Sequence, residues 1–323
     1  MVSVCAAQAV EYASNPLTHA DQLVVSDQGI TAYDSASLNI RWRQLTGEKT
    51  HEPVLAGDLI LVSSSSGLHA IESDSGNVRW HINTWTNLFP ATVGSGVAYL
   101  ASEEGVLRAL ALNRGELLWQ RHLPGWVYPP VIEGDRLYTG GSDGTVWAVD
   151  RNDGRVLWAR KLGQEMVYSP LSNRDGGVIV TTFAGDILAF SATGQLVWRT
   201  TLPTVPSSAV GLGGRFLFSG LDRQLYALDG RTGDLLWSRP LGGRLAAPLV
   251  QHQGHLLAAL DDGRLIGFDI QTGKGRELHQ ADGEPVASPA VQGDRTVLFV
   301  KSFKGPKAVI LKRRIGNNPV EET

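Results

Sequence analysis

Tryptophans recur along this chain at an almost constant interval. Six of the nine lie 38 to 40 residues apart, at Trp42, Trp80, Trp119, Trp158, Trp198 and Trp237. A self-similarity of about 40 residues is typical of propeller blades and of helical arrays. One period, Tyr128 to Trp158, holds short β-branched and aromatic runs separated by Gly-Asp and Asp-Gly pairs, which are typical of strands joined by tight hairpins. No segment carries an apolar period of 3.6 residues over ten or more residues, so the pattern favours propeller blades.

Each period predicts four strands, named A to D in chain order. Strand C follows a glycine-bearing turn and carries a small residue at a fixed place, and strand D carries the tryptophan. The small residue occurs eight times, at Ala32, Ala70, Ala109, Ala148, Ala189, Ala227, Gly267 and Ala308. We therefore expect an all-β fold, an eight-bladed β-propeller of four-stranded antiparallel blades, that forms a single domain over residues 15–314.

The first residues of the chain bear on how the ring closes. The last repeat has segments for strands A to C but no clear strand D, whereas residues 1–14 precede the first repeat. Cys5 precedes Pro16 by the same interval at which Trp42 precedes Pro53. This spacing predicts that residues 2–9 supply the missing outer strand, which would remove the unpaired edge of an open ring.

A different interpretation of residues 1–14 stays open. Ala7-Gln8-Ala9 has the small-x-small form of a signal-peptide cleavage site, and Cys5 is a candidate for lipidation. Both features indicate a periplasmic or otherwise extracytoplasmic protein, in the second case anchored to a membrane at its N-terminus. At the other end, residues 315–323 are expected to form a flexible tail.

Composition excludes several classes of function. The formal net charge of -3 gives no electrostatic basis for nucleic-acid binding. No apolar run approaches the roughly 20 residues that a transmembrane helix needs. The single cysteine excludes intramolecular disulfides and cysteine-rich metal clusters. We expect a monomer without a transmembrane segment.

The end of each repeat resembles a known family. Residues 148–158 and 227–237 both follow the pattern A-x-D-x-x-x-G-x-x-x-W, which is similar to the tryptophan-docking motif of the PQQ-like repeat, named after quinoprotein dehydrogenases. The resemblance covers nearly the whole chain and implies eight blades. Other repeats depart from the pattern at Leu38, Glu72, Ala111, Ser191 and Glu277, where Glu277 replaces the tryptophan.

The resemblance to quinoproteins raises the question of an enzyme that oxidises an alcohol or sugar with PQQ and calcium. Alcohol-oxidising members carry a vicinal cysteine pair beside the cofactor, and this chain has one cysteine. The connections between the predicted strands are also only a few residues long, whereas the family's catalytic groups lie in extended loops. We therefore assign no catalytic residue, no cofactor and no metal ligand, and we expect a protein that is not an enzyme.

Residues that break the repeat indicate where binding takes place. The connections from strand D to the next strand A open on one face, and three of them, residues 82–89, 121–129 and 161–169, carry large side chains that the repeat does not require. Aromatic residues, methionine and arginine are enriched at interface hot spots. The predicted partner-binding residues are Trp85, Phe89, Arg121, Trp126, Tyr128, Glu165, Met166, Tyr168 and Arg244. The alternative is that these aromatic side chains only fill the top of the central channel or pack between adjacent blades.

The sequence therefore predicts a non-catalytic, extracytoplasmic scaffold that binds a partner protein, such as a membrane-associated complex. In blade number and short loops it resembles the propeller lipoproteins of outer-membrane β-barrel assembly, which implies a role in outer-membrane protein assembly. A propeller that binds a small molecule or a metal (PQQ or calcium) and a diverged accessory of a quinoprotein dehydrogenase stay open as alternatives.

Overall fold

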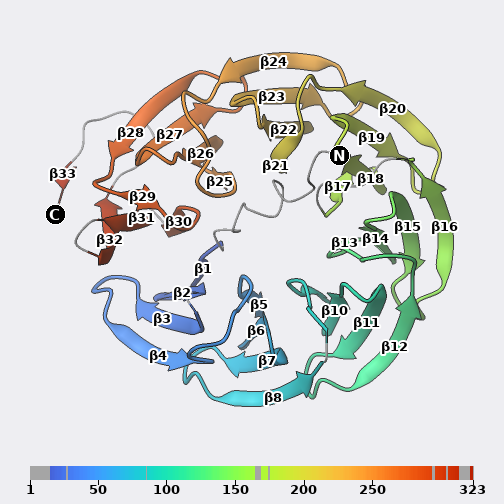
Figure 1. The fold of residues 1–323 in the computed structure, drawn as a ribbon, viewed down its shortest axis with the longest axis horizontal. Helices are drawn as coiled ribbons and strands as arrows, with labels where there is room; N and C mark the ends of the chain where they lie inside the picture. Colours follow the sequence, from blue (N-terminus) through green and yellow to red (C-terminus); the bar gives the residue numbers. More distant parts are fainter. Residues whose placement is uncertain are drawn as a thin grey trace, which may run out of the picture.

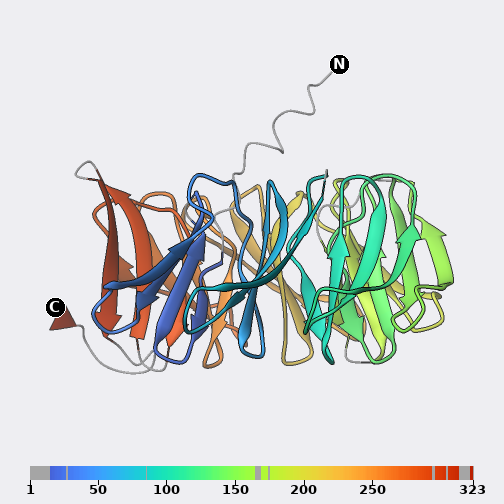
Figure 2. The same ribbon diagram turned by 90° about the horizontal axis from the view of Figure 1, so that it is seen from below.

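Eight antiparallel sheets stand side by side around a common axis, like the blades of a propeller (Figure 1). The computed structural model describes residues 15–26, 28–84, 86–163, 169–173, 175–292, 295–302, 305–312 and 321–322. Within these residues every regular element is a strand, and none of them forms a helix that could span a membrane. Viewed from the side, the blades form a disc (Figure 2). The predicted all-β, eight-bladed propeller is confirmed.

Blades 1 to 4 each contain four strands paired in chain order. Blade 1 consists of β1 (Leu17–His19), β2 (Gln22–Ser26), β3 (Ile30–Asp34) and β4 (Ile40–Gln44). Blade 2 consists of β5 (Val54–Ala56), β6 (Leu59–Ser64), β7 (Gly67–Glu72) and β8 (Val78–Asn83). Blade 3 consists of β9 (Thr92–Gly94), β10 (Val97–Ala101), β11 (Val106–Ala111) and β12 (Leu117–His122). Blade 4 consists of β13 (Val131–Glu133), β14 (Arg136–Gly140), β15 (Thr145–Asp150) and β16 (Val156–Lys161).

Blades 5 to 7 repeat this order, and blade 8 departs from it. Blade 5 consists of β17 (Leu171–Asn173), β18 (Gly177–Thr181), β19 (Asp186–Phe190) and β20 (Leu196–Thr201). Blade 6 consists of β21 (Pro206–Leu212), β22 (Arg215–Gly220), β23 (Gln224–Asp229) and β24 (Leu235–Pro240). Blade 7 consists of β25 (Val250–His252), β26 (His255–Ala259), β27 (Arg264–Asp269) and β28 (Gly275–Gln280). Blade 8 consists of β29 (Glu284–Pro285), β30 (Ala290–Gln292), β31 (Arg295–Ser302), β32 (Gly305–Lys312) and β33 (Glu321–Glu322).

In blades 1 to 7 the first strand lies nearest the axis and the fourth at the circumference (Figure 1). The two middle strands supply the core: all six residues of β6 are buried, as are five of the six in β7. Their apolar side chains pack against the adjacent blade, for example Leu61 and Ala70 of blade 2 with Ala98 and Leu100 of blade 3. A narrow range of separations suits two packed sheets, so the small residue on the third strand sets how closely neighbouring blades approach.

The tryptophan of each outer strand joins its blade to the next. In blades 1 to 6 it pairs with the small residue of the third strand, as Trp119 does with Ala109. Its ring covers a turn glycine of the following blade: a Cβ added to Gly154 would lie 2.5 Å from Cε3 of Trp119. Gly154 has a φ of 71°, a conformation that favours glycine. The tryptophans of blades 1 to 6 therefore hold each blade to the next.

Blade 8, which closes the ring, contains described residues from the C-terminal end of the chain. Its outermost position beside β32 holds β33, which pairs Glu321 with Lys312 and Glu322 with Leu311. These two residues belong to the segment predicted as a flexible tail, yet they are paired in a strand. Residues 2–9, predicted for the same outer position, lie outside the described residues. Blades 1 and 8 meet near the axis, where Thr18 Oγ1 donates to the Val291 carbonyl at 3.5 Å.

Candidate functional site

Two sets of loops share one face of the disc, here called the loop face. Because the four strands of a blade alternate in direction, the connection from the fourth strand to the next blade and the hairpin between the second and third strands emerge together. Isolated bridges tie the two sets to each other, at Leu88 with Ser102, Val127 with Gly141 and Leu245 with Leu260. The loop face is therefore a set of short loops braced against one another.

One position of the loop face varies in chemistry while its backbone stays fixed. Its carbonyl oxygen accepts a hydrogen bond from an amide of the adjacent hairpin in five blades, at 2.9 to 3.2 Å. The side chains at this position are Lys49, Asn87, Trp126, Val205 and Arg244. Since the backbone makes the structural contact, the fold does not require any particular side chain here.

Trp126 and Arg244, both predicted as partner-binding residues, occupy this variable position. Trp126 is 39% exposed, and its amide donates to Ser142 Oγ at 3.0 Å. Arg244 pairs with Asp261 of the next hairpin at 3.1 Å. The two side chains lie on the same face but in blades 4 and 7. They are therefore not neighbours in one site.

Phe89 and Tyr128 occupy a second position, two residues further along each connection. Their amides donate to Ala101 and Gly140 at 3.0 and 2.9 Å, and their rings lie 5.7 Å apart at 57°. Phe89 packs on the core between blades 3 and 4, and Tyr128 on the core between blades 4 and 5. Both side chains are half-buried, so packing between adjacent blades accounts for much of their surface.

The structure places Arg121 at a joint between blades. It lies on β12, and its Nε donates to the Gly154 carbonyl in the turn between β15 and β16 at 2.7 Å. Arg160 makes the same contact with Gly194, also at 2.7 Å. Arg121 is thus part of a repeated contact and is not brought together with Trp126 or Tyr128. Trp85, Glu165, Met166 and Tyr168 lie outside the described residues.

Sequence reasoning missed three residues of the loop face. Phe183 and Leu221 lie in the hairpins between the second and third strands of blades 5 and 6, and they are 39% and 64% exposed. The signal was present, because the same hairpin position holds Ser65, Glu103, Ser142 and Asp261 in other blades. A large apolar residue at a polar turn position is what a binding surface shows. His51, the third, shares the repeat position of Phe89 and Tyr128.

The hairpin that carries Leu221 is held by a hydrogen bond between two side chains. The Tyr226 hydroxyl donates to Asp222 Oδ2 at 2.5 Å. Burial of the phenol and this bond to a carboxylate together raise the pKa of Tyr226 to about 12. The hydroxyl therefore stays protonated and keeps the hairpin fixed at physiological pH.

Acidic side chains of the loop face accept hydrogen bonds that fix the conformation of its turns. Asp143 accepts from the Thr145 amide at 2.9 Å, from Thr145 Oγ1 at 2.8 Å and from Lys161 Nζ at 2.9 Å. Burial opposes ionisation of Asp143, but these hydrogen bonds and the Lys161 charge leave its pKa below the ordinary value. Across the described residues, no group of three or more His, Cys, Asp and Glu side chains is arranged to hold a metal ion.

Comparisons with known proteins agree with this architecture. The family model PQQ_2, described as outer membrane protein assembly factor BamB, matches residues 4–89, 82–204 and 183–318. Among curated proteins, the assembly factor BamB of Burkholderia pseudomallei is 28% identical over 160 residues, which are 48% of this chain and 41% of that protein. The BamB of Bordetella pertussis is 33% identical over 101 residues, 29% of this chain and 26% of that protein. The matched segments thus span less than half of these relatives.

Solved structures show the same fold. The crystal structure of BamB from Moraxella catarrhalis has a TM-score of 0.73 at 19% identity, with 93% of this chain and 96% of that chain covered. The computationally designed Ika8 protein has a TM-score of 0.77 at 14% identity, with 91% and 95% covered. Because the family model spans most of the chain, this protein belongs to the PQQ_2 family, described as outer membrane protein assembly factor BamB.

Proposed function

We propose that this chain is a non-catalytic scaffold that acts outside the cytoplasm and binds a partner protein through its loop face during outer-membrane protein assembly. The observation that carries the proposal is the exposure of Trp126, Phe183 and Leu221 on that one face, at positions where the repeat requires no apolar side chain. Its assignment to outer-membrane assembly rests on the names of the family and of the curated relatives.

The physical argument starts from the cost of leaving these side chains in water. Apolar surface removed from water contributes about 25 cal/mol per Å². Trp126 and Leu221 lie on short loops that are hydrogen-bonded to the neighbouring loop, and Phe183 lies in a hairpin closed by the Gly185 amide on the Thr182 carbonyl, so little ordering entropy is lost when a partner covers them. A rigid aromatic residue surrounded by polar loops is the common form of an interface hot spot.

The compartment follows from the same relationship. A protein that serves outer-membrane assembly works on the periplasmic side, which agrees with the cleavage-site-like Ala7-Gln8-Ala9 in the sequence. Lipidation of Cys5 as a membrane anchor is the alternative to cleavage after Ala9, since cleavage there would remove Cys5, and it would be detected as a mass increase of the mature chain.

The test is site-specific photo-crosslinking in the cells that make this protein. A benzophenone amino acid replaces Leu221 in one variant and Leu118 in a matched control, since Leu118 is 54% exposed on the outer strand β12. We expect the Leu221 variant to form an adduct with a component of the outer-membrane assembly machinery in the membrane fraction. Equal adducts from both variants, or none from Leu221, would contradict the proposal.

The cofactor prediction has its own test. A ligand that binds the folded state raises the melting temperature as its concentration exceeds its dissociation constant. We expect PQQ with calcium chloride to leave the melting temperature unchanged. A rise that saturates with PQQ concentration would instead favour a cofactor-binding propeller.

A further inference from the structure

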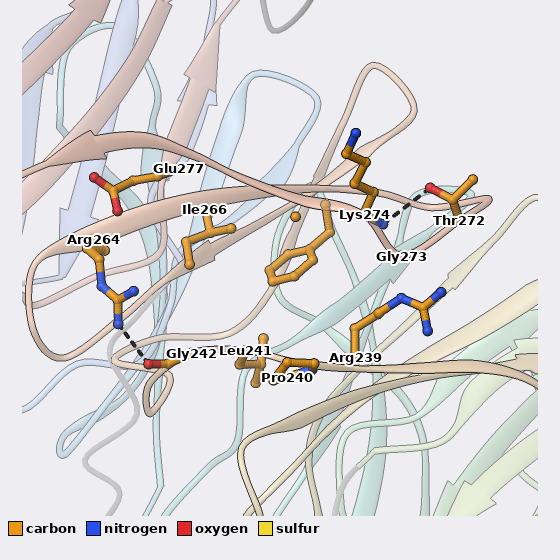
Figure 3. Close-up of a pocket in the computed structure, with 12 residues that line it drawn as sticks. Arg239, Pro240, Leu241, Gly242, Arg264, Ile266, Thr272, Gly273, Lys274 and Glu277 are labelled. Carbon is orange, nitrogen blue, oxygen red and sulfur yellow. Dashed lines mark hydrogen bonds between the residues drawn. The ribbon is translucent and has the colours of Figure 1, made fainter.

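A groove of about 720 Å³ opens between blades 6 and 7, beside their outer strands. Its floor is apolar and consists of Leu241, Ile266 and Phe268, all buried in the core that the two blades share. Figure 3 shows Arg264 and Glu277 at one end of the groove and Arg239 and Lys274 at the other. The groove, here called the rim groove, therefore combines an apolar floor with charged ends.

The rim groove exists because blade 7 has smaller side chains than blades 4 and 6 at two repeat positions. Ile266 occupies the position of Trp147 in blade 4 and Tyr226 in blade 6. Gly275 occupies the position of Leu235, and a Cβ there would lie 2.8 Å from Cε1 of Phe268. The aromatic ring of Phe268 thus takes the space that a side chain at position 275 would need, and the surface beside it is left hollow.

The register between the third and fourth strands shifts at a different residue in blade 7 than in blade 6. This difference brings Glu277 into the rim groove. In blade 6 the register shifts between Ala227 and Leu228, so that Ala227 pairs with Trp237. In blade 7 the shift lies between Leu265 and Ile266, and Glu277 pairs with Ile266. Residues that pair directly share a face of the sheet, so Glu277 lies on the side of blade 6.

Leu278 takes over the position that a tryptophan would fill on the other side of blade 7. It packs with Leu257 and Leu265 against blade 8, and a Cβ on Gly267 would lie 3.1 Å from Leu278 Cδ1. The core on that side is therefore complete without a tryptophan. Replacement of the tryptophan by Glu277 alters the rim groove without leaving a hole behind it.

The cationic side chains at the two ends of the rim groove differ in their ion-pair and hydrogen-bond partners. Arg264 is fixed: it pairs with Asp262 at 2.6 Å and donates to the Gly242 carbonyl at 2.7 Å. Arg239 is exposed, and its Nη1 donates to the neighbouring Ser238 carbonyl at 2.8 Å. Within the described part of the chain, no carboxylate lies within ion-pair distance of Arg239 or Lys274, although the protein as a whole carries a net charge of -3.

We propose that the rim groove binds an acidic, extended segment of a partner protein that places an aromatic side chain on Ile266 and Phe268 and a carboxylate between Arg239 and Lys274. Two cations without a carboxylate partner, beside an apolar floor, are complementary to a peptide with those two groups. The outer strand β24 is the last strand of its sheet, so its outer edge leaves room for an extended chain alongside. The lining residues differ from the exposed apolar residues of the loop face, so the two binding functions can be lost independently.

The test is selection of displayed random decapeptides on the full-length protein, followed by affinity measurement of the recovered peptides. We expect peptides with an aromatic residue next to Asp or Glu. Arg239→Glu should weaken their binding about fivefold, the loss of one favourable exposed ion pair. Arg160→Glu is the control for a charge reversal at the same repeat position outside the rim groove, since Arg160 is also exposed and donates Nη1 to the preceding carbonyl at 2.8 Å. Because Arg160 Nε also donates to Gly194, binding is compared at a temperature where both variants are folded.

A second variant fills the rim groove without disturbing a charge. Ile266→Tyr introduces the residue that blade 6 carries at this position, so the melting temperature should be maintained while peptide binding falls at least about tenfold. The double variant Trp126→Ala, Leu221→Ala should recover the same peptides as the wild type. Recovery of peptides without acidic and aromatic residues, recovery of none, or unchanged binding to Ile266→Tyr would each overturn the proposal.

Discussion

The indole Nε1 of Trp119 donates a hydrogen bond to the carbonyl oxygen of Arg151 at 3.0 Å, 32 residues later and in the next blade. Trp42, Trp80, Trp158 and Trp198 make the corresponding bond to Ser73, Leu112, Ala192 and Gly230 at 2.9 to 3.2 Å. Each joint therefore combines a hydrogen bond with the contact of an indole ring on a turn glycine. This double contact explains why both residues recur in the sequence.

Trp237 offers an internal comparison for the hydrogen bond. Its Nε1 is buried and has no partner within the described residues, while the Ile270 carbonyl accepts from Arg215 Nη1 at 3.0 Å. Trp119→Phe should lower the free energy of unfolding by about 1 kcal/mol more than Trp237→Phe, because only the first loses a hydrogen bond. Urea unfolding followed by circular dichroism checks this. Equal losses would mean that the bond contributes nothing net.

Two turn glycines allow the cost of a strained backbone to be distinguished from the cost of displacing an indole ring. Gly134 has a φ of 56° with nothing within 4 Å of an added Cβ, whereas Gly154 has a φ of 71° and contacts Trp119. Gly134→Ala should cost about 1–2 kcal/mol, the strain of a left-handed alanine. Gly154→Ala should cost clearly more, since the indole must also move. Melting temperatures of the two variants give the difference, and a similar loss in both would show that the ring contact is easily rearranged.

Stability should fall in mild acid because of His69. Its imidazole is buried, stacks on His81 with ring centroids 5.4 Å apart, and lies 2.9 Å from Ser66 Oγ, which also donates to Glu48. Burial lowers the pKa of His69 below 6.5, and His81 adds to this, while the Glu48 charge opposes it.

The sign follows from linkage between protonation and folding. The unfolded chain binds the proton more readily, so the stability from neutral His69 is complete above about pH 6.5 and declines as the pH falls towards the lower folded-state pKa. His69→Leu, the residue type of Leu188 at the same repeat position, should reduce the loss of melting temperature between about pH 7 and pH 5. At higher pH the two proteins should differ by a constant amount. A parallel decline in acid would contradict the prediction.

The exposed apolar residues of the loop face should matter for binding and not for folding. Trp126→Ala and Leu221→Ala should change the free energy of unfolding by about 0.5 kcal/mol or less, as surface substitutions do. Both should reduce capture of the partner from a membrane fraction. If instead the melting temperature falls by several degrees and capture is unchanged, these side chains serve packing alone.

The single cysteine makes ring closure testable. Trp119, which pairs with Ala109 in blade 3, precedes the first residue of β13 by the same interval at which Cys5 precedes the first residue of β1. If residues 2–9 form the outer strand of blade 8, Cys5 should lie opposite Ala308. Directly opposed residues have Cα atoms about 4.5–5.5 Å apart, a distance that suits a disulfide.

Ala308→Cys should therefore form an intramolecular disulfide under mild oxidation, seen as a mobility shift on a non-reducing gel. Ala227→Cys, at the same repeat position in blade 6, is the control that should stay reduced. A free thiol in the Ala308→Cys protein would instead favour the cleaved-signal interpretation of residues 1–14. The described strand β33 leaves space for this closure, because it pairs with Leu311 and Lys312 at the far end of β32.

Much of the fold could be predicted because the residues that make the contacts between strands and between blades recur in every repeat. Ala148 and Trp158 occur at a fixed spacing since they pair across two strands, and Gly154 accompanies them since the preceding tryptophan lies on it. Any residue that has the same role in every blade recurs at the interval of the repeat and can be found in the sequence. The eight small residues thus predicted eight blades correctly.

The candidate site was harder to predict, for a related reason. A residue that breaks the repeat shows that something differs but not what it touches: Arg121 breaks no rule once its bond to Gly154 is known. Leu221 lies in a turn, where the hairpin pattern predicts polar residues, so its departure is recognised only when the same hairpin position is compared across the blades. The rim groove depends on a register shift between Leu265 and Ile266, and the regular spacing of the repeat does not show where this shift lies.

The contact between Thr18 and Val291 determines the order in which this protein can be assembled. Joints such as that of Trp119 link residues 32 apart and can form as soon as two blades exist, whereas Thr18 and Val291 are 273 residues apart. Closing the longer segment costs about 2 kcal/mol more in chain entropy than closing the shorter one. By this difference in chain entropy, the seam between the first and last blades is the last joint to form and the first to open, so the protein is an open arc before it is a ring.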